Sequence, residues 1–257
     1  CETGLLSVTG TPDAPAKDMS ITVGWNTAQA VGITREEMDA WAARSHQRAI
    51  AAMDAGKFVD EILPLKIQQL DGSVVDFSVD EHPRRDTTAE KLAALKVLHP
   101  EIEGSTNTAG NSSGTNDACA AVAVVDRAYA AAEKLTVMAT VKAWAAAGVP
   151  PRDTGLGAVK AIAKVLERAG LKPSDVALWE VNEAFAAVPI AACREFGLDE
   201  ELVNFSGSGC SLGHPIAASG ARMVTTLIYE LQRRGGGIGV AAMCAGGGQG
   251  GAVVVEV

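Results

Sequence analysis

The chain has 257 residues and a formal charge of -9, and 47% of its residues are hydrophobic while 21% are charged. These proportions are typical of a soluble globular protein with enough material for a sizeable core. The acidic balance argues against nucleic acid as the main partner, because phosphate binding depends on clustered Lys and Arg. No apolar run is long enough to cross a membrane, so we expect neither a membrane span nor a membrane partner.

Turn residues and hydrophobic periodicity predict regular elements along most of the chain. Thr34 and Glu37 have the spacing of a capping box, which predicts a long helix over 35–55. A turn signal at Asp71-Gly72 joins two short strands. The other predictions, in chain order, are strands at 62–67 and 73–79, helices at 89–98 and 118–134, an extended segment at 136–144, a helix at 155–169, a strand at 176–181, helices at 183–196 and 215–233, and strands at 239–243 and 252–257. This alternation predicts an α/β fold with a mixed sheet covered by helices.

The five cysteines are odd in number and lack metal-ligand spacing, so we expect free thiols and no metal site. Free thiols persist in a reducing compartment, which predicts a cytoplasmic protein. Cys119 and Cys193 lie within helical patterns and are expected in the core. Cys210 is expected to pack as a small apolar side chain rather than to take a redox or catalytic role. The remaining two are Cys1 and Cys244.

His214 follows a glycine-rich segment, residues 206–213, and precedes Pro215, a residue suited to the first turn of a helix. The sequence therefore places His214 at a helix N-terminus. There the helix dipole disfavours a positive imidazolium, so the ring is expected to stay neutral near pH 7 and to act as a base or a hydrogen-bond donor. The alternative is a loop histidine that only caps a helix.

Two further residues are predicted to join His214, because the carboxyl ends of sheet strands gather the sites of open α/β folds. Asn182 and Cys244 each end a predicted strand. The Cys244 thiol can exchange a proton if a neighbour brings its titration near neutrality. Asn182 and His214 can donate to an oxygen that becomes negative, and the amides of 246–248 can form a second oxyanion site. The alternatives are that Cys244 is a small buried hydrophobe and Asn182 a helix cap.

Four motifs in order give the chain a strong resemblance to the C-terminal part of a thiolase. They are Asn182-Glu183-Ala184-Phe185, Gly213-His214-Pro215, the Cys-x-Gly-Gly-Gly pattern from Cys244 to Gly248, and the Gly/Ser/Asn-rich stretch from Thr108 to Asp117. The resemblance implies a layered αβαβα fold. It also implies a loop domain at 1–115, the remainder of an N-terminal core domain at 116–137, and a complete C-terminal core domain at 138–257.

The same resemblance implies an acyltransferase that acts on coenzyme A thioesters, by thiolytic cleavage or the reverse Claisen condensation. Coenzyme A would be substrate or product, and no covalently bound cofactor is expected. Cys244 would be the acid/base, and His214 would activate a nucleophilic cysteine. With a water held by Asn182, His214 would also stabilise an enolate or thioester oxygen, and the Gly246 N–H would serve the other oxyanion hole. The residues expected to line the pantetheine channel are Ala109, Ser113, Ala184 and Phe185.

The nucleophilic cysteine of thiolases lies in an N-terminal half that has no counterpart in this sequence. We therefore expect a partner chain, an N-terminal thiolase half, in a heterodimer that dimerises further. Cys1 has three interpretations: an arbitrary start, a gene-encoded boundary after loss of a leader, or the product of precursor cleavage, including autocatalytic cleavage by its own thiol. The alternative functions are a hydrolase or amide-forming enzyme with Cys1 as a catalytic N-terminal nucleophile, and a non-catalytic acyl-coenzyme A- or lipid-binding protein.

Overall fold

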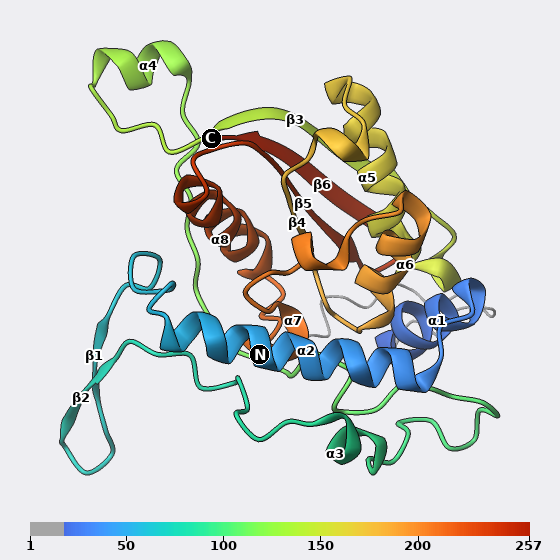
Figure 1. The fold of residues 1–257 in the computed structure, drawn as a ribbon. Helices are drawn as coiled ribbons and strands as arrows, with labels where there is room; N and C mark the ends of the chain where they lie inside the picture. The colour runs from blue at the N-terminus through green and yellow to red at the C-terminus, as the bar shows by residue number, and fades with distance from the viewer. Residues whose placement is uncertain (1–17) are drawn as a thin grey trace.

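The computed structural model describes residues 18–257, so Cys1 lies outside the described residues. A four-stranded mixed sheet in the order β3-β6-β5-β4 forms the centre of the molecule (Figure 1). Strand β4 runs parallel to β5, and β6 is antiparallel to both of its neighbours. The strands are β3 (Thr140–Gly148), β4 (Leu178–Val181), β5 (Ile238–Ala245) and β6 (Gln249–Glu256). The predicted α/β class with a mixed sheet is confirmed.

Helices cover both faces of this sheet, because successive strand residues point to opposite sides. On β5, Val240 and Ala242 belong to a core shared with α5 (Leu156–Ala169) and α6 (Ala187–Phe196). Ala241, between them, belongs to a second core formed with α8 (Ser219–Arg233). The sheet therefore separates two apolar layers.

Helix α5 approaches β6 so closely that side chains are excluded from the contact. A Cβ added to Gly157 would lie 2.3 Å from the Gln249 carbonyl oxygen, and one added to Gly250 would lie 2.0 Å from the Gly157 carbonyl oxygen. Glycine at both positions allows this backbone contact. The same helix ends as predicted at Gly170, which adopts a left-handed φ of 66°.

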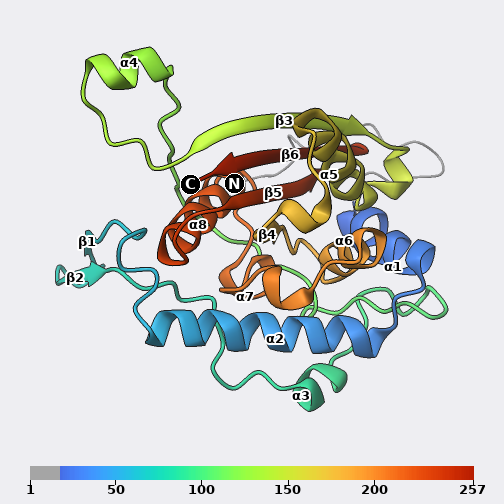
Figure 2. The same cartoon turned by 45° about the horizontal axis from the view of Figure 1, so that its top comes forward.

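The long helix α2 (Arg35–Asp54) runs beneath the sheet, with α7 (Gly209–Leu212) between them (Figure 2). Its predicted capping box is present: the Glu37 N–H donates to Thr34 Oγ1 over 3.2 Å, and the Thr34 N–H donates to the Glu37 carboxylate over 2.8 Å. Before it lie a π-helical turn (Ser20–Trp25) and α1 (Asn26–Val31).

After α2, a hairpin projects from the body (Figure 1). Its strands are β1 (Leu65–Gln68) and β2 (Val74–Phe77), close to the predicted positions, and Gly72 turns between them at a φ of 86°. The next helix, α3 (Ala89–Ala93), is shorter than predicted. No helix within residues 18–257 combines the length and the apolar composition needed to cross a bilayer.

The predicted helix at 118–134 is wrong except at its end. Only α4 (Arg127–Ala132) is helical, and the chain before it is irregular. The Asp126 carboxylate caps α4 by accepting the N–H groups of Ala128 and Tyr129, and the β-branched valines upstream disfavour a helix. Consequently Cys119 is exposed rather than part of the core.

Two predicted helices near the site begin one turn late. The chain at 183–186 is held by backbone bonds to a distant loop: Ser113 N–H donates to the Ala184 carbonyl over 2.9 Å, and Ala186 N–H to the Asn111 carbonyl over 3.0 Å. These bonds replace the first helical turn, so α6 begins at Ala187. Helix α8 likewise begins at Ser219 and not at Pro215.

Candidate active site

Backbone contacts bring together the three segments that carry Asn182, His214 and Cys244. The Asn182 N–H donates to the Ala242 carbonyl over 2.9 Å, which places Asn182 beside the end of β5. The loop that carries His214 lies against both strand ends. A Cβ on Gly209 would be 2.5 Å from the Glu183 carbonyl oxygen, and one on Gly220 would be 3.6 Å from Met243 Sδ. The three segments therefore lie together at the carboxyl ends of β4 and β5.

His214 is held at two points. Its backbone N–H donates to Asn116 Oδ1 over 3.0 Å, and its ring Nδ1 lies 2.6 Å from Ser219 Oγ. Burial, and then the positive charge of Arg222, lower the pKa of His214 to about 4. The ring is therefore neutral near pH 7, as predicted.

The predicted cause of that neutrality is wrong. His214 precedes a turn rather than a helix, because the Pro215 carbonyl accepts the N–H groups of Ala218 and Ser219 over 2.9 Å each and α8 starts only at Ser219. The helix dipole acts within the first turn of a helix, so it is not the main influence on this ring. Desolvation and the positive charge of Arg222 are the main causes of the lowered pKa of this ring.

The Asn182 side chain is fully buried, and neither its Oδ1 nor its Nδ2 finds a hydrogen-bond partner among residues 18–257. Burying an amide without partners costs several kcal/mol, on the order of 1–3 by mutational data. A group that pairs with this amide would recover that free energy. Asn182 is not a helix cap, because α6 begins five residues later.

Asn204 holds the backbone immediately before Asn182. Its Oδ1 accepts the Val181 N–H over 2.8 Å, and its Nδ2 donates to the Val181 carbonyl over 2.8 Å and to Glu183 Oε1 over 2.9 Å. Asn204 is buried with a φ of 51°, a left-handed conformation that asparagine tolerates better than most residues. No motif in the sequence marks this residue.

Glu183, the residue after Asn182, joins several segments through one buried carboxylate. Besides Asn204, Oε1 accepts Trp41 Nε1–H over 2.8 Å, and Oε2 accepts the Ser45 hydroxyl over 2.6 Å and the Cys210 N–H over 3.1 Å. These donors come from α2 and α7. Glu183 was recognised only as a motif position, since its partners lie far away in the sequence.

Cys244 lies in β5, one residue from its end, and is only 4% exposed. Burial raises the pKa of its thiol to about 12, more than its backbone hydrogen bond lowers it. The expectation that this thiol titrates near neutrality is therefore wrong for this state of the protein. Cys244 is protonated and is an acid rather than a thiolate.

The glycine turn after Cys244 offers fewer free amides than predicted. Gly248 N–H donates to Thr154 Oγ1 over 3.0 Å, and its carbonyl accepts the Val149 N–H over 2.7 Å. The Gly248 N–H is therefore already hydrogen-bonded within the protein and cannot bind an oxyanion. Gly246 is half-buried in this turn and stays the candidate for the second oxyanion site.

The loop expected to contact coenzyme A is tied to the site. Ser112 and Phe185 form an isolated antiparallel bridge beside the Ser113–Ala184 bond. Ala184 and Phe185 are buried, Ser113 is half-buried and Ala109 is exposed. The structure thus brings Ser113, Ala184 and Phe185 together.

Two other cysteines are buried in the core. Cys193 and Cys210 are buried as predicted, and burial raises the pKa of Cys193 to about 12. Within residues 18–257, no group of three or more His, Cys, Asp or Glu side chains is arranged to hold a metal ion.

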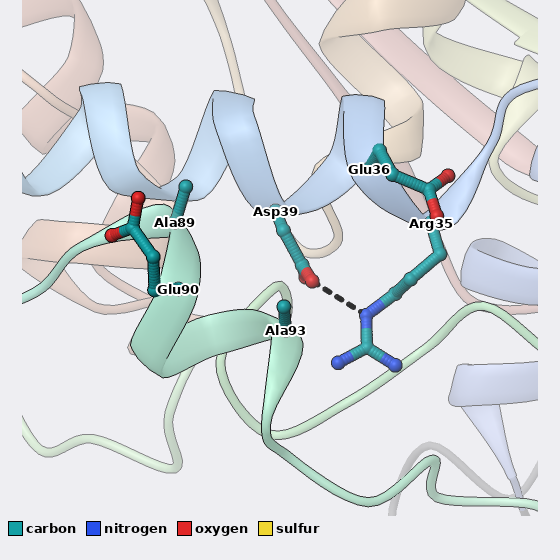
Figure 3. A pocket seen from close by; sticks show the side chains of 6 residues that line it. All are labelled: Arg35, Glu36, Asp39, Ala89, Glu90 and Ala93. Atoms are coloured by element: carbon teal, nitrogen blue, oxygen red, sulfur yellow. Dashed lines mark hydrogen bonds and ion pairs between the residues drawn. The ribbon is translucent and has the colours of Figure 1, made fainter.

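A cavity of about 320 Å³ lies between α2 and α3 and contains none of the predicted site residues (Figure 3). Arg35 Nε pairs with Asp39 over 2.6 Å, and Arg35 Nη2 donates to the carbonyls of Leu92 and Leu95. The other Asp39 oxygen accepts Asn111 Nδ2–H over 2.8 Å. Through these bonds Arg35 and Asp39 hold α3 and the loop around Asn111 against α2, so the two charged side chains have a structural role.

Comparison with known proteins identifies relatives of both parts of the chain. The model of the thiolase N-terminal domain matches residues 3–128, and that of the thiolase C-terminal domain matches residues 135–257. The acetyl-CoA acetyltransferase of Allochromatium vinosum is 46% identical over 235 residues, 91% of this chain and 59% of that protein. The 3-ketoacyl-CoA thiolase of Bacillus subtilis is 43% identical over 239 residues, 90% of this chain and 60% of that protein.

Solved structures agree with these relatives. The Bacillus anthracis acetyl-CoA acetyltransferase superposes with a TM-score of 0.86 at 42% identity, covering 93% of this chain and 59% of that one. Human mitochondrial 3-ketoacyl-CoA thiolase in complex with CoA has a TM-score of 0.83 at 38% identity, covering 93% and 58%. The chain therefore spans a little under 60% of the length of these structures. The matches to both domain models, the sequence identity and the shared fold show that the chain belongs to the thiolase family.

Proposed function

We propose that this chain carries the acid/base and oxyanion-binding residues of an acyltransferase that acts on acyl-coenzyme A thioesters. The observation that carries the proposal is the fully buried Asn182 amide, which has no partner among the described residues and lies on the edge that His214 and Cys244 share. An unsatisfied amide beside a neutral imidazole suits an oxygen that gains negative charge during a reaction. Simple ligand storage would not require an acid/base pair.

The protonation states of His214 and Cys244 support different roles for the two residues in thiolytic cleavage, a base and an acid. Neutral His214 accepts the proton of a nucleophilic cysteine, whose sulfur then attacks the keto carbon of a 3-ketoacyl thioester. The carbon–carbon bond breaks and leaves an enolate, and the Cys244 thiol supplies the proton that completes the acyl-coenzyme A product. A thiol whose pKa is raised to about 12 holds that proton until a strong base forms.

The Cys244 thiolate then takes the proton of the coenzyme A thiol, whose sulfur attacks the acyl group held on the nucleophilic cysteine. The second acyl-coenzyme A forms, the cysteine sulfur leaves and recovers its proton from His214, and both thiols are restored. The Claisen condensation is the reverse sequence.

Asn182, through a water, would stabilise one oxygen together with His214, and the Gly246 N–H would stabilise the other. Ser113, Ala109, Ala184 and Phe185 would line the channel for the pantetheine arm. The support is that backbone bonds already join the loop at 111–113 to the residues that follow Asn182. Coenzyme A is then substrate or product.

The model of the thiolase N-terminal domain matches residues 3–128, so part of that domain lies in this chain, and the nucleophilic cysteine would come from a partner chain that carries the rest of it. Apolar side chains before and along β3 support such a partner, because they are exposed here: Val124 by 78%, Val137 by 59% and Trp144 by 66%. A heteromer of this kind would bury that surface. The buried thiols of Cys193 and Cys210 suit a reducing cytoplasm.

The test is thiolysis of acetoacetyl-coenzyme A by the native assembly and its variants. We expect Cys244→Ala and His214→Ala each to lower kcat by roughly a hundredfold to ten-thousandfold, because each removes an acid or a base. Cys119→Ser, which removes an exposed thiol, is the control and should keep full activity. Activity of either site variant within a few-fold of wild type would contradict the proposal.

A thiol-directed acyl probe followed by peptide mapping identifies the nucleophile. Labelling of a cysteine outside this chain would support the proposal that a partner chain supplies the nucleophile. Labelling of Cys1 would instead favour the N-terminal-nucleophile hydrolase, and binding of coenzyme A without turnover or labelling would favour a non-catalytic protein.

A further inference from the structure

The Ser219 hydroxyl makes two contacts that restrict where protons can lie. Ser219 Oγ is 2.6 Å from His214 Nδ1 and 3.0 Å from the Pro215 carbonyl oxygen. Ser219 is only 1% exposed, so solvent does not compete for its hydroxyl. The carbonyl oxygen can only accept a hydrogen bond, whereas a serine hydroxyl has one proton to donate and lone pairs to accept with.

Only one tautomer of neutral His214 makes both contacts hydrogen bonds. If Nδ1 carries the proton, it donates to Ser219 Oγ, and the hydroxyl donates to the Pro215 carbonyl four residues back, as serines near helix starts commonly do. If Nε2 carries the proton, the hydroxyl must turn toward Nδ1. Two oxygen lone pairs then face each other across the 3.0 Å between Ser219 and Pro215.

We propose that Ser219 is a positioning residue that holds His214 in the Nδ1–H tautomer and so leaves the Nε2 lone pair free as the base. The Asn116 bond to the His214 N–H holds the backbone of the same residue in place. Nothing in the four motifs marks Ser219 for this task, and its role appears only from the two distances.

The catalytic consequence rests on the proposed function. The thiol S–H bond of the nucleophilic cysteine breaks and an N–H bond forms at Nε2, while Nδ1–H keeps its bond to Ser219. The proton on Nε2 then faces the oxygen that becomes negative. One imidazole therefore serves first as base and next as donor, and Ser219 makes the order possible by keeping Nε2 unprotonated at the start.

Ring-nitrogen NMR of the native protein with isotopically labelled histidine tests the tautomer without any substrate. The chain has four histidines, and His214→Gln identifies the signals of His214. We expect a protonated Nδ1 and an unprotonated Nε2 at pH 7 to 8. In Ser219→Ala the pattern should move toward the Nε2–H form that free imidazole side chains prefer, and Ser219→Thr, which keeps the hydroxyl, should restore it.

Ser211→Ala is the matched control. Ser211, in α7, is also a buried serine near His214 in the sequence, but its hydroxyl bonds Ser45 and the Ser208 carbonyl, so the His214 signals should not change. The signals of His46, His82 and His99 report whether each variant is folded. Protonated Nε2 in the wild type, or an unchanged Nδ1–H pattern in Ser219→Ala, would overturn the inference.

Activity gives the second readout. Ser219→Ala should lower kcat for thiolysis roughly tenfold to a hundredfold, as loss of an outer partner of a functional imidazole commonly does, with KM little changed and recovery in Ser219→Thr. The role of Ser219 and the proposed acyltransferase function can be tested independently, because His214 can be in the Nδ1–H tautomer in a protein that has no acyl transfer activity. A wrong tautomer in a protein whose His214→Ala variant is inactive would overturn only the role of Ser219.

Discussion

Glu180 and Glu183 lie three residues apart at the end of β4, and both are fully buried, yet their surroundings differ. Both Glu183 oxygens are occupied by two donors each. Glu180 uses only Oε2, which accepts Arg222 Nη1–H over 3.0 Å and the Ser208 hydroxyl over 3.3 Å, and its Oε1 has no partner in the described part of the chain. Burial, opposed by Arg222, raises the pKa of Glu180 to about 7.

The difference teaches what a buried carboxylate can do at this edge. Glu183 is a joint: its donors come from α2, α7 and Asn204, so it connects the segment that carries Asn182 to three other parts of the chain. Glu180 can gain or lose its proton near neutral pH, because the one guanidinium beside it does not fully offset the desolvation of its carboxylate. Removing the first should damage the fold, and removing the second should change how stability depends on pH.

Glu183→Gln should have the largest effect. All four partners of the carboxylate donate, so either orientation of an amide places its NH2 against two donors. Leaving buried donors unpaired predicts a loss of roughly 3 kcal/mol or more in the free energy of unfolding. Urea denaturation at pH 7 measures this, with Glu36→Gln on the exposed face of α2 as the control. A loss below about 1 kcal/mol would show that Glu183 is not the joint described.

Glu180→Gln should have an intermediate effect that grows with pH. Between about pH 4.5, the ordinary pKa, and about 7, the native wild type holds a proton that the unfolded chain has released, so wild-type stability falls as pH rises. The glutamine variant does not titrate and lacks this fall. Its stability relative to wild type should therefore increase from pH 5 to pH 8, by on the order of 2 kcal/mol.

Thermal unfolding at intervals from pH 5 to pH 8 tests this. His214, whose lowered pKa makes stability rise with pH, is present in both proteins and cancels in the difference. A difference that stays constant over this range would mean that Glu180 is ionised throughout.

The sequence predicted best the elements whose ends are decided locally. The Thr34 capping box, the Gly170 stop and the Asp71-Gly72 turn each depend on residues within four positions, and each is found. The errors lie where distant backbone replaces local bonds, as at 183–186, and where a run of alanine hides β-branched residues, as at 118–126. Propensity is a weak prior against such tertiary contacts.

For the candidate site, the motifs point to Asn182, His214 and Cys244 but not to the residues that hold their segments in place. Asn204 contacts Val181 across 23 residues, and Trp41 reaches Glu183 across 142. No local pattern encodes such pairs. The protonation of Cys244 depends on how deeply β5 is buried, a property of the assembled core, and the expectation from the sequence about its pKa is therefore wrong.

Glu200→Gln should have the smallest effect and sharpens the comparison. Glu200 pairs with Arg44 over 2.6 Å, a shorter distance than that between Glu180 and Arg222, but its side chain is 48% exposed. Water already solvates this carboxylate, and Arg44 keeps a second contact 4.3 Å over the Trp41 ring. The expected loss in unfolding free energy is about 0.5 kcal/mol or less, and smaller still in high salt. A urea midpoint lowered as far as in Glu183→Gln would mean that distance, rather than burial and the number of donors, decides what a carboxylate contributes here.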